Sequence, residues 1–154
     1  METTKQISVF SENKPGRLAK VLQALYREKI NVVALTVMDS HEHSVLRLVS
    51  DDPAKTREVA KTLGTPVAET EVLLVELRNQ PGSLAHVCEL LGSEHINIDY
   101  AYCSSGGRQG KTLGVFKVSN AEKAMRVLSE PNGSTGRSRT ERRPPRDRRS
   151  YQLR

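Results

Sequence analysis

The 154-residue sequence has no tryptophan, only two cysteines, and few aromatic residues, which make up 4% of the chain. Cys88 and Cys103 are too few for a disulfide framework, so we expect them to be reduced packing residues of a cytoplasmic protein. No apolar run approaches the roughly 20 residues that a membrane-spanning helix needs. The start of the chain, Met1 to Gln6, is polar and has no signal-peptide core. We therefore expect a cytoplasmic protein with no membrane partner.

Lysine is absent from residues 131–154, although the rest of the chain has nine. This segment holds eight arginines against two acidic residues, which accounts for the whole net charge of +6. Its large apolar residues are Tyr151 and Leu153 alone, so it cannot bury enough surface to fold. We expect an uncharged folded part in residues 1–130 and an Arg-rich disordered tail in residues 131–154.

The sequence also lacks a catalytic or metal-binding pattern. His41 and His43 are fewer than the three or four ligands that zinc usually takes. The glycines of residues 106–110 precede Lys and Thr, but Ser105 stands where a phosphate-binding loop needs its first glycine, and the segment joins two predicted strands. A flexible hairpin fits this segment better. We expect no enzyme, no cofactor and no metal site.

An internal repeat is the main feature that the sequence does contain. Residues 79–85 (NQPGSLA) repeat residues 13–19 (NKPGRLA) at an offset of 66. The same offset relates Ile96-Asn97-Ile98 to Ile30-Asn31-Val32. Further on, the match between Val49-Ser50-Asp51 and Val118-Ser119-Asn120 has an offset of 69, which predicts three extra residues in the second copy. Two copies of this length indicate a duplicated small domain rather than a solenoid.

Hydrophobic periodicity predicts the same order of elements in both copies. In the first copy we expect strands at 5–10, 32–38, 45–49 and 66–70, with helices at 18–28 and 53–63. In the second we expect strands at 72–77, 97–103 and 112–118, with helices at 82–95 and 121–128; a last strand is missing, because the chain enters the tail. The fold class is α+β, two tandem ferredoxin-like βαββαβ units with helices on one face of each antiparallel sheet. The expected domains are 1–70 and 71–130.

The other face of the sheet predicts a homodimer. If Ile7 and Val9 point to the helices, then Phe10 points away from them, and Met38 and Leu74 lie on the same helix-free face. These residues would form an unusually large apolar patch on a monomer. We expect a second copy to cover it, although contact with loops alone is an alternative.

The strand–Pro-Gly–helix turn at residues 13–18 predicts a binding site for a small charged molecule. Such a turn presents a helix N-terminus, which suits a carboxylate, and glycine lets a ligand approach the backbone. Asn13 offers a donor and an acceptor, and Asn31 follows it by 18 residues at the start of an edge strand. When two units pair edge to edge, the turn of one faces that strand of the other. The alternatives are a simple turn and asparagines, Asn31 and the corresponding Asn97, that only cap backbone groups.

These motifs resemble the ACT-domain family, the amino-acid-sensing modules of phosphoglycerate dehydrogenase, aspartokinase and the acetolactate synthase small subunit. The resemblance rests on N-x-P-G-x-L followed by I-N-V or I-N-I, found twice, and covers residues 5–128. It implies an amino-acid site between paired domains. The implied ligand-binding residues are Asn13, Pro15, Gly16, Arg17, Leu18 and Asn31 in the first copy, and Asn79, Pro81, Gly82, Ser83, Leu84 and Asn97 in the second.

The copies differ at the position two before the first Asn, where some amino-acid-binding members have a polar residue. Ser11 stands there in the first copy and Leu77 in the second. The resemblance predicts a non-catalytic regulatory protein that binds a free amino acid and signals to an amino-acid biosynthetic enzyme. The alternative is a scaffold with degenerate ligand sites, which binds nucleic acid or another polyanion through its basic tail alone.

Overall fold

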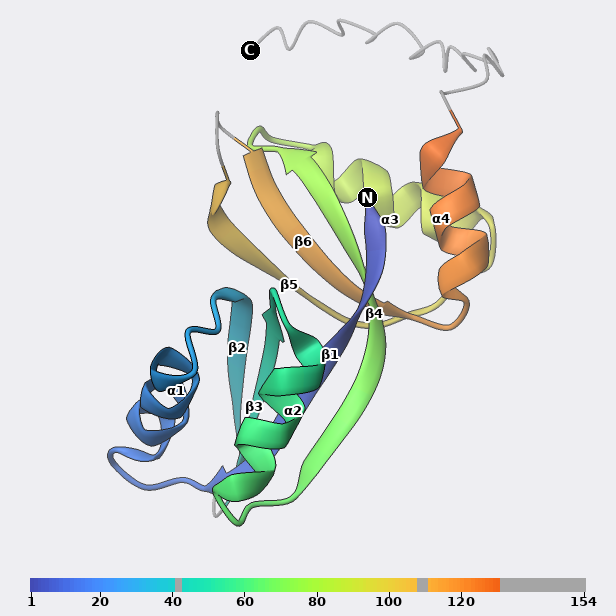
Figure 1. Ribbon diagram of the computed structural model, residues 1–154. Helices are drawn as coiled ribbons and strands as arrows, with labels where there is room; N and C mark the ends of the chain where they lie inside the picture. Colours follow the sequence, from blue (N-terminus) through green and yellow to red (C-terminus); the bar gives the residue numbers. More distant parts are fainter. Residues whose placement is uncertain (41–42, 108–110, 131–154) are drawn as a thin grey trace, which may run out of the picture.

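The computed structural model describes residues 1–40, 43–107 and 111–130, which form four helices and six strands (Figure 1). In chain order these are β1 (Glu2–Glu12), α1 (Arg17–Arg27), β2 (Val32–Ser40), β3 (His43–Ser50), α2 (Pro53–Thr62), β4 (Val67–Arg78), α3 (Ser83–Ser93), β5 (Ile98–Gly107), β6 (Lys111–Val118) and α4 (Ala121–Ser129). None of the described helices is long and apolar enough to cross a membrane. The expected tail lies outside the described residues, as do parts of the two expected hairpin loops.

All six strands belong to one antiparallel sheet with the order β2-β3-β1-β4-β6-β5. The α+β fold of two ferredoxin-like units is therefore confirmed. The strands expected separately at 66–70 and 72–77 are a single strand, β4, so the expected boundary between residues 70 and 71 falls inside it. No glycine, proline or other turn residue interrupts the sequence VAETEVLLVELR, so the chain passes from one unit into the next without a turn.

The N-terminal half of β1 occupies the place of the missing last strand of the second unit. Glu2 pairs with Leu74 and Lys5 with Glu71, whereas the pairing of β1 with β3 begins only at Ile7. The strand thus serves the second unit at its start and the first unit at its end. The sequence analysis placed the start of β1 at Lys5, because the residues before it are polar. Their backbone pairing, rather than their side chains, holds them to β4.

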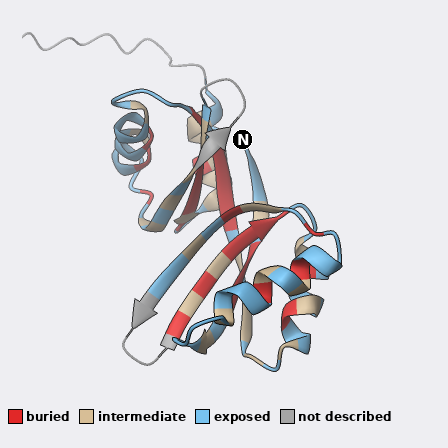
Figure 2. Ribbon diagram, turned by 90° about the vertical axis from the view of Figure 1, so that its left-hand side faces the viewer, coloured by how far each residue is buried: buried red, intermediate tan, exposed pale blue. Residues whose placement is uncertain are grey.

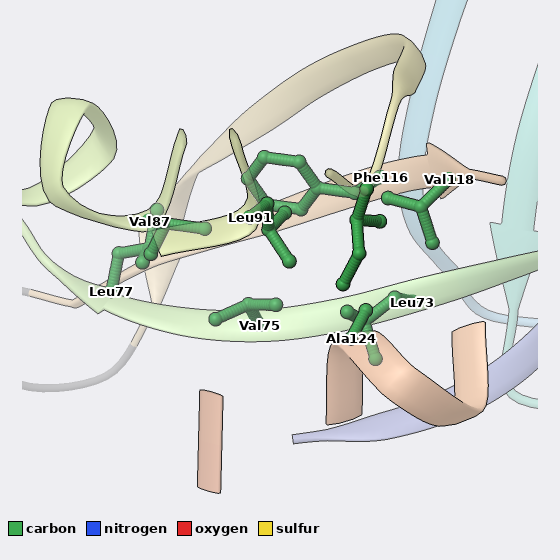
Figure 3. Packing of buried hydrophobic residues seen from close by; sticks show 9 residues of the cluster. Leu73, Val75, Leu77, Val87, Leu91, Phe116, Val118 and Ala124 are labelled. Atoms are coloured by element: carbon green, nitrogen blue, oxygen red, sulfur yellow. The ribbon is translucent and has the colours of Figure 1, made fainter. Parts of the chain in front are cut away.

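Both helix pairs cover the same face of the sheet. Ile7 faces α1 and α2 and pairs with Glu69, which lies on the same side of β4 as Leu73, four residues on. Leu73 and Leu77 belong to one buried cluster with Val87 of α3 and Ala124 of α4; Leu73 lies beside Ala124, and Leu77 beside Val87 (Figure 3). Each unit therefore has its own helix-side core, and Figure 2 shows that the helices are buried only along the stripe that faces the sheet.

The helix-free face curls on itself, so that the edge strands β2 and β5 approach each other. Ala34 and Val49 of the first half join Val72, Leu74 and Val115 of the second in a third buried cluster. This corrects the expected patch in part: Leu74 is only 6% exposed within a single chain, whereas Phe10 and Met38 are 39% and 48% exposed on the same face. A flat sheet was assumed, whereas strand twist closes a long sheet over its own apolar face.

A hydrogen-bonded polar group lies inside the curl and joins the two halves. The Gln6 amide, fully buried, donates to the Tyr100 hydroxyl at 2.8 Å and to Ser8 Oγ at 3.3 Å, and the Tyr102 hydroxyl donates to Gln6 Oε1 at 3.1 Å. The Arg47 guanidinium stacks 3.8 Å above the centre of the Tyr100 ring. Burial raises the pKa of the Tyr102 phenol above its ordinary value, so Tyr102 stays a hydrogen-bond donor.

The repeat extends to individual contacts. Asp52 and Asn120 cap α2 and α4 by accepting from the backbone N–H three residues on. Lys55 Nζ donates to Glu28 O at 2.8 Å, and Lys123 Nζ to Glu94 O at 2.7 Å. The caps are 68 residues apart, so the offset of 69 inferred from residues 49–51 is wrong by one. The match of two similar tripeptides misled the alignment, and the second copy is longer by two residues rather than three.

Candidate functional site

Each Pro-Gly turn leads into a helix whose start carries no side-chain cap. Gly16 and Gly82 adopt the left-handed backbone conformation, with φ of 83° and 88°. Only glycine takes this conformation without strain, which explains its place in both turns. Pro15 and Gly16 are exposed. The N–H groups of Arg17 and Ser83 donate to Lys14 O and Gln80 O within the turns at 3.3 Å, and the N–H groups that follow them in the first turn of α1 and α3 have no side-chain cap.

Charged side chains flank the first turn on both sides. The Glu12 carboxylate lies 2.7 Å from Lys14 Nζ and accepts from the Arg17 guanidinium at 3.2 Å. The hydrogen bond from Lys14, aided by Arg17, holds the pKa of Glu12 below its usual range. The turn thus presents an ionised carboxylate and two cations within a few residues of the start of α1.

A small cavity lies beside this turn, between α1 and the sheet. Ser11 of β1 and Ser44 of β3 face each other across the strand pair, with their hydroxyl oxygens 3.2 Å apart. Both line the cavity, together with Arg17 and Leu18 from the first turn of α1 and Val37 from the edge strand β2. The expected residues Arg17 and Leu18 therefore sit where backbone donors, hydroxyl groups and a cavity meet.

The second turn has a different chemical character. Leu77, only 8% exposed, takes the place of Ser11, and its partner across the sheet is Thr112. Arg78 and Ser83 take the places of Glu12 and Arg17, so the second turn has no carboxylate at the position where the first one has it. Leu84, like Leu18, is largely exposed.

Asn31 and Asn97 lie far from the turns of their own units. Asn31 precedes β2 at the end of the sheet where Val32 pairs with Ser50, whereas the first turn follows Glu12 at the opposite end. The nine residues of β2 separate the two ends by roughly 30 Å. The structure therefore brings Asn13, Pro15, Gly16, Arg17 and Leu18 together but leaves Asn31 apart from them.

The backbone of both asparagines is held by a repeated pair of hydrogen bonds. Asn31 N–H donates to Asp51 Oδ1 at 3.0 Å, and Asn97 N–H donates to Ser119 Oγ at 3.1 Å. The Asn97 side chain also donates to Asp99 at 2.8 Å. These bonds fix the positions of the two residues, and the Asn97 side chain bonds a carboxylate rather than the backbone group that the capping alternative requires.

Two residues of the first site, Ser44 and Val37, were missed by sequence reasoning. Neither belongs to a repeated motif, and Ser44 becomes relevant only through its pairing with Ser11 across strands 33 residues apart. Cys88 and Cys103 are exposed and free, so the expectation that they pack in the interior is wrong. Among residues 1–40, 43–107 and 111–130, no group of three or more metal-ligating side chains occurs; the expected loop histidine His41 lies outside them.

The structure is a tandem of two ferredoxin-like units that share one sheet. In each unit, a Pro-Gly turn leads into the first helix. The chain belongs to the ACT domain pair family, whose model matches residues 2–134. It is 34% identical to protein BT0572 from Bacteroides thetaiotaomicron, with a TM-score of 0.77 over 83% of this chain and 88% of that one. The resemblance noted in the sequence is thereby confirmed.

Two more distant structures share the fold. The regulatory subunit of aspartate kinase from Thermus thermophilus is 18% identical, with a TM-score of 0.62 over 83% of this chain and 95% of that chain. E. coli aspartokinase III, in complex with lysine and aspartate, is 23% identical, with a TM-score of 0.52 over 83% of this chain and 30% of that enzyme. Comparison with curated protein sequences gives no match.

Proposed function

We propose that this chain is a non-catalytic regulatory protein that binds a free α-amino acid at the first Pro-Gly turn. The observation that supports this is the start of α1, which lies at the surface without a side-chain cap. The N–H groups that follow Arg17 in the first turn of α1, with the positive end of the helix dipole, suit an α-carboxylate. Glu12, held in its ionised form nearby, suits the α-ammonium group. A zwitterion thus finds both charges matched within one turn.

A second copy of the chain is needed to bring Asn31 to this ligand. Asn31 and the first turn lie at opposite ends of β2, which is an edge strand of the sheet. In a two-fold dimer with the two β2 strands antiparallel, the turn end of one copy meets the Asn31 end of the other. We propose this dimer, in which two equivalent amino-acid sites form between the copies.

The exposed side chains favour β2 over the other edge strand, β5. On the helix side of β2, Leu35 and Val37 are 40% and 46% exposed. The equivalent residues of β5 are Ala101 and Cys103, which offer much less apolar area. Burying an exposed Leu or Val side chain stabilises by roughly 1.5–3 kcal/mol, so the β2 edge gains more from pairing.

The proposed signal is a change in how the two copies are oriented. A ligand that contacts the turn of one copy and Asn31 of the other stabilises only the arrangement that places both correctly. The proposed partner is an enzyme of amino-acid biosynthesis, and the fold shared with the regulatory subunit of aspartate kinase supports this choice.

A thermal-shift screen of the twenty amino acids tests the proposal. A ligand present at 100 times its dissociation constant stabilises a protein by roughly 2.7 kcal/mol, so the binding amino acid should raise the melting temperature by several degrees. The matched control is Asn13→Ala, which should lose most of the shift. If no amino acid shifts the melting temperature, the proposed function is wrong.

A further inference from the structure

The cavity beside the first turn limits the size of any side chain that enters it. Its volume is about 20 Å³, and a single water molecule needs roughly 10–15 Å³. Val21, Ser44 and Leu46 in its wall are buried, and they belong to the packed layer between α1 and the sheet. Widening the cavity on this side would displace core residues. It therefore has room for one or two non-hydrogen atoms.

The position of the cavity directs the ligand's side chain into it. Arg17 and Leu18 line the cavity and are also the first two residues of α1. An α-carboxylate held by the N–H groups of this helix start lies directly beside the opening. The Cα of the ligand is then one bond from the carboxylate carbon, and its side chain has this cavity as the nearest hollow, which opens to solvent beside Leu18 and Val37.

The lining of the cavity is neutral and carries a hydroxyl pair. Among its lining residues, all of which are described, only Arg17 is charged, and Arg17 already donates to Glu12 at 3.2 Å. A side-chain carboxylate there would compete with Glu12 for Arg17, and a side-chain ammonium group would find no carboxylate among the lining residues. The hydroxyls of Ser11 and Ser44, 3.2 Å apart, retain lone pairs that can accept from a third hydroxyl.

Building on the proposed function, we propose that the first site selects an uncharged α-amino acid whose side chain has no more than two non-hydrogen atoms. Serine fits best, because its hydroxyl reaches the Ser11–Ser44 pair, and alanine and glycine follow. In the second copy, Leu77 replaces Ser11, and Thr112 stands opposite it. The second turn therefore does not share this preference.

Calorimetric titration of the full-length chain with glycine, alanine, serine, threonine, leucine, lysine and aspartate tests the inference. Serine should bind about ten-fold more tightly than threonine, which has one more methyl group, and about a hundred-fold more tightly than leucine. Leucine, lysine or aspartate binding as tightly as serine, in a manner lost in Asn13→Ala, would overturn the size limit. Binding that is lost in Asn79→Ala alone would also overturn it, because the ligand would then use the second turn.

Variants of the wall separate the size limit from the proposed function. Val37→Ala removes two methyl groups from the cavity wall, so it should reduce the preference for serine over threonine at least about threefold; because Val37 also lies on the proposed β2 interface, sedimentation checks that the variant is still a dimer. Cys103→Ala, at the equivalent position of β5, is the control and should keep the preference. Ser11→Leu copies the second unit and should abolish serine binding while the far-ultraviolet circular dichroism stays unchanged.

The possible outcomes are distinct. An unchanged serine preference in Val37→Ala, with serine still bound, would show that the cavity does not select the ligand, while amino-acid binding itself would stand. If no amino acid gives a binding heat at about 10 mM, any affinity is weaker than millimolar. That result would instead overturn the proposed function and this inference with it.

Discussion

At the scale of single residues, charged side chains as well as glycine determine the structure of the first turn. Lys14 and Arg17 hold the pKa of Glu12 below its usual range, so Glu12 stays ionised to a lower pH than a free glutamate. The ion pairs that order the turn are present above the ordinary pKa of about 4.3 and are lost as the pH falls through the lowered value. The turn is therefore fully charged at neutral pH.

We expect Lys14→Met to raise the pKa of Glu12 toward its ordinary value, because the strongest hydrogen bond to the carboxylate is removed. A pH titration of the Glu12 side-chain carboxyl by NMR measures this. Lys61→Met, which removes the partner of the exposed Glu58, is the control and should leave Glu12 unchanged. An unaltered pKa of Glu12 in Lys14→Met would mean that the ion pair does not persist in solution.

The buried Gln6 group gives a second test at this scale. Gln6→Leu should destabilise the protein by about 1–3 kcal/mol, because the Tyr102 hydroxyl loses its acceptor and the Tyr100 hydroxyl loses its donor. Adding Tyr102→Phe should cost less than it does alone, since its partner is already gone. Urea denaturation of the single and double variants measures the coupling. Strictly additive losses would contradict the network.

Sequence reasoning reached some of these residues and missed others for physical reasons. The Pro-Gly turns and their helices follow from local rules, and the structure has them where they were expected. Ser44 and the Gln6–Tyr100 pair depend on strands that meet only after folding, 33 and 94 residues apart in the chain. No local pattern marks such a residue.

At the scale of elements, β1 and β4 each serve both units. Deleting residues 1–5 should remove the outer strand of the second unit and lower the free energy of unfolding by about 2–4 kcal/mol, at roughly 0.5–1.5 kcal/mol for each backbone hydrogen bond lost. Hydrogen exchange of β4 amides at residues 71–74 should rise, whereas β3 amides should stay protected. Urea denaturation and exchange measured by NMR check both expectations.

Removal of residues 131–154 is the matched control for that deletion. The place beside β4 that a last strand of the second unit would take is filled by β1. We expect truncation at residue 130 to leave the melting temperature within a few degrees. A large loss on truncation, together with a small loss on deleting residues 1–5, would mean that the tail forms the outer strand.

The edge strands provide the element-scale test of the dimer. Leu35→Glu places a charge on the helix side of β2 and should convert the dimer into a monomer, because a carboxylate would be buried between the copies. Ala101→Glu makes the equivalent change on β5 and should leave the dimer intact. Sedimentation of both variants and the parent at tens of micromolar decides the matter; a parent chain that is monomeric there contradicts the proposed dimer.

The helices and most of the strands could be predicted from the sequence, whereas the strands that connect the two units could not. Apolar periodicity gave all four helices and the central strands, since each element has one buried face. The continuity of β4 and the early start of β1 escaped it. Both depend on polar residues such as Glu71 and Thr3, whose place in the sheet is set by backbone pairing.

At the scale of the whole molecule, duplication and curling explain why the two sites are unequal. The shared β1–β4 pair ties the two units into one sheet, and the curl buries the middle of the helix-free face while Phe10 and Met38 stay exposed. The β2 edge beside the first turn is the surface that we propose for self-association. The first unit thus combines an open helix start, a charged turn, a cavity and an apolar edge.

The most direct test of this account is calorimetry of the parent chain, Asn13→Ala and Asn79→Ala with the amino acid that the screen identifies. Asn13→Ala should weaken binding about ten-fold to a hundred-fold, the effect of losing one hydrogen bond to a charged ligand group. Asn79→Ala should weaken it far less, because Leu77 and Arg78 make the second turn a poorer site. Unchanged affinity in Asn13→Ala, or a larger loss in Asn79→Ala, would contradict the assignment of the amino-acid site to the first turn.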